Sequence, residues 1–146
     1  MAATWIDLLD PTYEELKAKA PRELEETALE VLLDRPEHDD EPRPTLQGHG
    51  DYVFGNFLAA RAKTDEDAIY YQEVGLVITC ESILTVRKTP AGGFPPFDMD
   101  DVRRIVRESD STGMIAYRIV DTIAEVYLDL VDDVDSEIDE LEDRVD

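Results

Sequence analysis

The residues best suited to chemistry in this sequence are carboxylates, and three of them stand together as Asp65, Glu66 and Asp67. They fall between two predicted strands, so the turn that joins the strands would position them. Carboxylate oxygens are hard ligands of the kind that Mg²⁺ and Ca²⁺ prefer, and Mg²⁺ needs only one or two of them because it keeps several waters. The sequence supports two hypotheses for this turn, a divalent-metal site or an ordinary solvated acidic turn.

Other reactive residue types form no recognisable catalytic or zinc-binding pattern in the sequence. His38 and His49 lie in a segment rich in proline and glycine, and neither a glycine-rich nucleotide motif nor a Cys/His zinc spacing occurs. Cys80, the single cysteine, lies in an apolar run, and we predict a small buried strand residue there. We therefore expect neither an enzyme nor an intrachain disulfide.

The overall charge limits the kind of partner. The chain has 146 residues, 36 of them acidic and 14 basic, which gives a formal net charge of −22. Nucleic acids and anionic lipids are polyanions and would be repelled, whereas divalent cations, cationic partners or a high-salt setting fit. The only cluster of bases is Arg103, Arg104 and Arg107, on a predicted helix, and we expect it to be solvated or ion-paired.

Hydrophobic patterning predicts an α/β fold in one folded domain. We expect strands at residues 4–10, 45–46, 51–62, 69–79 and 82–88, and helices at 11–20, 21–34, 99–110 and from 114 to the end. The strand at 51–62 is largely apolar on both faces, which predicts cover on both sides. The two strands that flank residues 80–81 predict a hairpin, and Asp98 is a candidate cap for the helix that follows it.

The last predicted helix carries an unbroken heptad pattern. Its apolar residues are spaced alternately by four and three, and we call them the seam: Val120, Ala124, Tyr127, Val131, Val134, Ile138, Leu141 and Val145. A period of 3.5 residues predicts a partner helix in the same chain or another. Nine of residues 131–146 are acidic, so the partner should be basic or accompanied by cations. No Gly, Asn or Pro stops the helix near its end, so we expect it to continue in a longer structure.

Four segments form a recognisable series along the chain: WIDLLDPTYEEL at 5–16, RPTLQGHGDYVFGNFLA at 43–59, EVGLVITCESILTVRK at 73–88 and the final helix from residue 113. In this order and approximate spacing they resemble the N-terminal cytoplasmic domain of CorA-type magnesium transporters. The resemblance spans nearly the whole chain, and its most specific parts are the strand pair at 73–88 and the final helix.

This resemblance implies a three-layer α/β/α domain with a mixed central sheet at residues 1–110, followed by a long acidic helix at 111–146 that forms one arm of a helix pair. It also implies a homopentamer at the cytoplasmic face of the cell membrane. The family's stalk, its two transmembrane helices and its Gly-Met-Asn motif are not in this sequence. The segment as given is therefore expected to be soluble.

The resemblance further implies that Mg²⁺ bound between neighbouring cytoplasmic domains holds the channel closed and that its loss lets carboxylates repel and the pore open. The regulatory metal position then matches Asp65, Glu66 or Asp67, with Asp121 as a second contributor. The principal ligand of the neighbouring subunit would lie on the stalk. The transported ion would be magnesium, with cobalt as a second candidate. The alternatives are the same domain of a zinc-transporting relative, or a soluble acidic module that docks a basic helix.

Overall fold

The computed structural model describes residues 3–34, 44–63 and 68–145, and these form a mixed sheet between two helical layers. The elements in chain order are β1 (Thr4–Leu9), α1 (Tyr13–Lys19), α2 (Glu26–Leu33), β2 (Thr45–Gly48), β3 (Val53–Ala62), β4 (Ile69–Ile78), β5 (Ser82–Arg87), α3 (Asp100–Ile105) and α4 (Thr112–Val145). The α/β prediction and the long final helix are confirmed.

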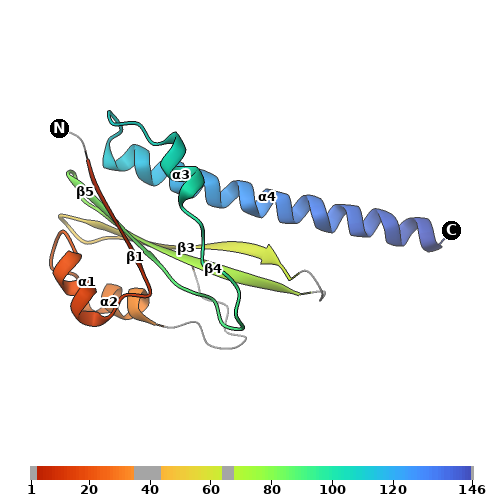
Figure 1. Cartoon of the computed structure of the whole chain (residues 1–146), viewed down its shortest axis with the longest axis horizontal. Coiled ribbons are helices and arrows are strands. Elements are labelled where there is room, and N and C mark those ends of the chain that lie inside the picture. Colours follow the sequence, from red (N-terminus) through yellow and green to blue (C-terminus); the bar gives the residue numbers. More distant parts are fainter. Residues whose placement is uncertain (1–2, 35–43, 64–67, 146) are drawn as a thin grey trace.

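The strands are arranged in the order β1-β5-β4-β3-β2. β1 runs parallel to β5, whereas β2, β3, β4 and β5 pair antiparallel with their neighbours, so the sheet is mixed as expected. β4 and β5 form the predicted hairpin. Parallel pairing of β1 with β5 places the first strand of the chain beside the last one (Figure 1).

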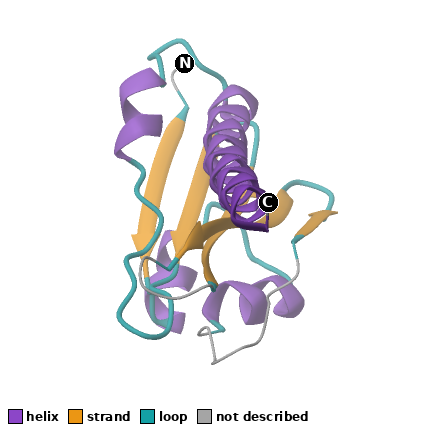
Figure 2. Ribbon diagram, turned by 90° about the vertical axis from the view of Figure 1, so that its right-hand side faces the viewer, coloured by secondary structure: helices purple, strands orange, loops and turns teal. Residues whose placement is uncertain are grey.

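Helices cover both faces of the sheet, which explains why the central strands are apolar on both sides. On one face, Val74 and Leu76 pack with Ile115 and Ile119 of α4. On the other face, side chains from α1 and α2, among them Leu16 and Leu32, pack against a second cluster of strand residues that includes Phe54 and Val77. Figure 2 shows the long helix over one face and the two short helices on the opposite face.

Two predicted helices are shorter in the structure than in the sequence pattern. α2 begins at Glu26 rather than near residue 21, although Leu24, just before it, is already buried in the core. α3 ends at Ile105 because Val106 adopts an extended conformation. The N-cap of α3 is Met99, and the Asp98 carboxylate acts one residue earlier, accepting a hydrogen bond from Asp100 N at 2.9 Å.

The prediction of a buried Cys80 is wrong, because Cys80 is exposed in the β4–β5 turn. β4 ends at Ile78, and Thr79 closes the turn through hydrogen bonds to both backbone groups of Ser82. The apolar run therefore stops two residues before the cysteine, and a turn residue faces solvent.

One carboxylate fixes the start of α4 against the loop that leads into it. Asp110 accepts hydrogen bonds from Arg118 Nε at 2.8 Å and from Arg107 N at 2.9 Å. The hydrogen bond from Arg118, followed by the one from the Arg107 backbone, lowers the pKa of the Asp110 carboxyl below its ordinary value. The ionised form of Asp110 is thus favoured by the folded state.

This pKa shift predicts a pH dependence of stability. A carboxyl with a lowered pKa in the folded state stabilises the protein above its unfolded pKa of about 3.9, and the contribution is lost as pH falls through the folded value. Asp110→Asn should therefore lower the free energy of unfolding at pH 7, and the difference from wild type should shrink below about pH 4. Urea unfolding across pH measures this difference, with Asp129→Asn on the exposed part of α4 as control. A deficit that stays constant with pH would contradict the assignment.

Candidate functional site

The β3–β4 hairpin holds both ends of the segment that was predicted to bind metal. The two strands pair in register from Val53 opposite Ile78 to Ala62 opposite Ile69. Beyond the strands, Lys63 N donates a hydrogen bond to Ala68 O at 2.9 Å. Asp65, Glu66 and Asp67 lie between these two residues and outside the described part of the chain, so the metal turn remains a prediction.

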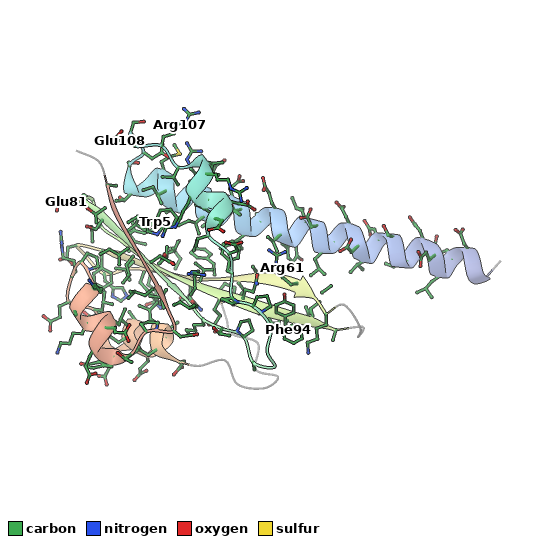
Figure 3. The ribbon with its side chains drawn as sticks, viewed as in Figure 1. Trp5, Arg61, Glu81, Phe94, Arg107 and Glu108 are labelled. Carbon is green, nitrogen blue, oxygen red and sulfur yellow. The ribbon has the colours of Figure 1, made fainter. Side chains whose placement is uncertain are left out.

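The loop between β5 and α3 contacts the end of the hairpin that leads into the acidic turn. Gln72 Nε2 donates to Pro95 O at 3.1 Å, and Gln72 Oε1 accepts from Arg61 Nε at 3.1 Å. The rings of Tyr70 and Phe94 are stacked with their centroids 4.3 Å apart. Figure 3 shows Arg61 and Phe94 near the ends of β3 and β4. The strand ends that flank the acidic turn are therefore held by side-chain as well as backbone contacts.

Two cations precede the acidic turn in the sequence. Lys63 Nζ lies 5.4 Å from the centre of the Phe94 ring, and Arg61 lies two residues earlier on β3. Cations so close in sequence to Asp65 and Asp67 would compete with a metal ion for the same carboxylates.

Asp121 is exposed on α4. Within residues 3–34, 44–63 and 68–145, no group of three or more His, Cys, Asp or Glu side chains converges as a metal site would require. In the described part of the chain, Asp121 therefore belongs to no such group. The role that the sequence resemblance implies for Asp121 stays a prediction.

α4 has two adjacent apolar stripes, of which one is buried against the sheet and the other is exposed. One stripe faces the sheet: Ile115, Ile119 and Ile123 are buried, and Val126 packs beside them. The other stripe is the seam, and its described members are exposed: Val120, Ala124, Tyr127, Val131, Val134, Ile138 and Leu141. The sheet is therefore not the partner that the heptad spacing predicts. In the described part of the chain, no helix covers the seam.

The same helix carries a continuous negative surface. From residue 119 to residue 143 the sequence contains no Lys or Arg. The described carboxylates of this stretch are exposed: Asp121, Glu125, Asp129, Asp132, Asp133, Asp135, Asp139, Glu140, Glu142 and Asp143. Such a surface attracts cations without specific ligation, because summed charges raise the local counter-ion concentration.

Sequence patterning missed a buried polar group beneath α2. Glu73 Oε1 lies 3.5 Å from Lys88 Nζ and accepts a hydrogen bond from Asn56 Nδ2 at 3.1 Å, and all three side chains are buried. The available signal was an Asn and a Glu inside otherwise apolar strands, which is costly unless each finds a partner. The group belongs to the α1/α2 face of the sheet, away from α4.

None of the helices described here is both long enough and apolar enough to cross a membrane. α4 has the length, but its many carboxylates exclude it from a hydrocarbon environment.

A family model and solved structures match this chain. Residues 2–146 match the family model described as CorA-like Mg²⁺ transporter protein. No curated protein sequence matches the chain. The fold is similar to the structure of the soluble domain of CorA from Methanocaldococcus jannaschii, with a TM-score of 0.64 and 21% sequence identity over 96% of this chain and 54% of that one.

A second solved structure, the full-length CmaX protein, is similar with a TM-score of 0.66 and 12% identity over 94% of this chain and 41% of that one. At these identities the likeness shows a shared fold. The chain spans about half the length of the Methanocaldococcus jannaschii domain that it matches.

Proposed function

Because the chain belongs to the CorA-like Mg²⁺ transporter family, we propose that it is the cytoplasmic Mg²⁺-sensing and gating domain of a divalent-cation transporter. The proposal includes assembly as a homopentamer at the cytoplasmic face of the cell membrane, with magnesium as the transported ion and cobalt as a second candidate. The alternative within the family is that this chain is the same domain of a zinc-transporting relative.

The observation that supports the proposal is that α4 is packed on the sheet along one half and exposed and acidic along the other. Its first half is anchored in the sheet core through Ile115, Ile119 and Ile123, and its second half exposes carboxylates and the seam. A change in repulsion between carboxylates of neighbouring subunits would therefore act on the whole domain, because a helix packed on a sheet moves with it. Divalent cations reduce that repulsion, so their concentration would set the arrangement of the subunits.

The chemistry of the proposed site is ordinary Mg²⁺ ligation by carboxylates. Mg²⁺ keeps several waters and takes one or two carboxylates from protein, so two subunits contributing one each would complete a site. Asp65, Glu66 or Asp67 would contribute from one subunit, with Asp121 as a second contributor. The principal ligand of the neighbouring subunit would come from the stalk, which is not in this sequence. One chain alone would then hold half of each site.

Millimolar Mg²⁺ is expected to raise the thermal midpoint of this chain by about 1–3 °C, because a ligand that binds only the folded state stabilises it. Asp65→Ala combined with Asp67→Ala should abolish the increase. The measurement is thermal unfolding followed by circular dichroism, with NaCl at equal ionic strength as the reference.

The matched control is Asp129→Ala combined with Asp139→Ala, which removes two exposed carboxylates from α4 and leaves the turn intact. If both double variants respond to Mg²⁺ as wild type does, the response comes from the ion atmosphere around the whole chain, and the turn is not the site.

The exposed seam favours a second candidate function, the docking of a basic helix. A synthetic peptide of about four heptads with Leu and Ile at the seam positions and Lys beside them should bind the chain. A peptide of the same pattern with Glu in place of Lys should not, because α4 is acidic. Fluorescence anisotropy measures the binding, and loss of binding in Ile138→Asp with Leu141→Asp would place it on the seam. Equal binding of both peptides by this variant and by wild type would exclude this function.

A further inference from the structure

The helix α2 depends on residues next to the strands of the sheet for hydrogen bonds at both of its ends. It spans only the eight residues Glu26–Leu33, and isolated helices of this length are unstable in water. Its N-cap residue, Glu25, makes no side-chain capping hydrogen bond, and its last turn contains no basic residue. The free backbone groups at both ends therefore need partners from elsewhere.

Two buried side chains from the sheet side supply those partners. At the start of α2, Glu25 N donates a hydrogen bond to the Tyr52 hydroxyl at 2.8 Å, and Tyr52 immediately precedes β3. At the end of α2, the Lys88 ammonium donates to the carbonyl oxygen of Val31, and Lys88 immediately follows β5. A cation at the C-terminal end of a helix also interacts favourably with its dipole.

Between its ends, α2 rests on the backbone of β4. A Cβ atom placed on Gly75 would lie 2.3 Å from Cδ2 of Leu32, so the glycine permits this close approach. Ala28 and Leu32 are buried there in the cluster formed with Phe54. The core residues that α4 covers form a separate cluster on the opposite face of the sheet.

We propose that α2 is a strap that opens as one unit and uncovers the buried Lys88–Glu73 pair while the sheet and α4 stay folded. The helix cannot persist once it leaves the sheet, because Tyr52 and Lys88 then cap neither end. Opening also returns two buried charges to water, and the regained hydration offsets part of the lost apolar contact. This inference does not rest on Mg²⁺ sensing, so the two proposals stand or fall separately.

The test is native-state hydrogen exchange on the full chain, resolved by residue. The amides of α2 should exchange through an opening that depends less on urea than the opening of β4 and of the sheet-packed half of α4. Tyr52→Phe removes only a hydroxyl at the start of the helix, and Lys88→Met removes the cap at its end. Each variant should speed exchange along the whole of α2 by about fivefold or more, as expected for the loss of one helix cap.

The matched controls are Tyr117→Phe and Lys17→Met, which change exposed residues on α4 and α1. They should leave the exchange of α2 unchanged. The proposal is overturned if Tyr52→Phe affects only the first turn, which would be simple fraying, or if α2 exchanges only with global unfolding. Should Lys88→Met unfold the protein, the Tyr52→Phe result alone decides between these outcomes.

Discussion

Replacing Arg87 with methionine is expected to lower the free energy of unfolding by about 3 kcal/mol. The guanidinium contacts the Asp7 carboxylate through Nε and Nη2, at 3.0 and 2.7 Å from Oδ2, and Nη1 donates to Phe97 O at 2.9 Å. It thus joins edge strand β1 and the loop after β5 to the centre of the sheet. The variant leaves Asp7, whose side chain is 11% exposed, with only the Thr85 hydroxyl as a described side-chain partner.

Arg104→Met provides the matched control for this prediction. Arg104 also forms an ion pair, with Asp101 at 3.1 Å, but both side chains are 74% exposed. Exposed pairs contribute little because water screens them, so the expected change is within about 0.5 kcal/mol. Urea unfolding followed by circular dichroism compares the two variants directly. Equal effects would mean that the Asp7–Arg87 pair is no more important than a surface pair.

The sequence predicted local structure well where one physical signal dominated. Alternating and β-branched residues located β3, β4 and β5, since apolar periodicity reports which backbone must be buried. Sequence patterning failed where contacts between residues far apart in the chain determine the structure. The cap of α2 by Lys88 joins residues 57 positions apart, and the Trp5–Thr85 hydrogen bond joins residues 80 apart. No local pattern encodes such pairs.

The sequence predicts the class of ligand for the candidate site, a cation, but it does not predict the geometry of the site. Clustered carboxylates in a chain of net charge −22 indicate a cation as ligand, and that inference needs no coordinates. The sequence does not identify the partner of each carboxylate, because a site shared between subunits, as proposed above, would leave only half of its ligands in one sequence. The basic face of α3 shows the same limit. Arg104 forms the kind of exposed ion pair that was expected there, with Asp101 one helical turn earlier. Arg103 instead lies over the Trp5 ring at 4.2 Å, and the helix pattern does not encode that long-range contact.

The heptad spacing of α4 describes only one of its two apolar stripes. The stripe that packs on the sheet and the seam lie side by side, and each follows helical periodicity. Spacing alone could not say which stripe the sheet takes. The structure assigns the sheet to the stripe with Ile115, Ile119 and Ile123 and leaves the seam exposed. A matched pair of substitutions can test this assignment in solution.

Ile119→Ala is expected to lower the free energy of unfolding by about 2–5 kcal/mol, because Ile119 is fully buried and its truncation leaves a cavity in the core. Ile138→Ala is the same chemical change on the seam, where the side chain is 46% exposed, and should cost about 0.5 kcal/mol or less in the single chain. Urea unfolding at several protein concentrations distinguishes two reasons for a larger Ile138 effect. An effect that grows with concentration would show that copies of the chain already pair through the seam. An effect that is independent of concentration would mean that the seam is covered within one chain, contrary to the exposure of Ile138 in the structure.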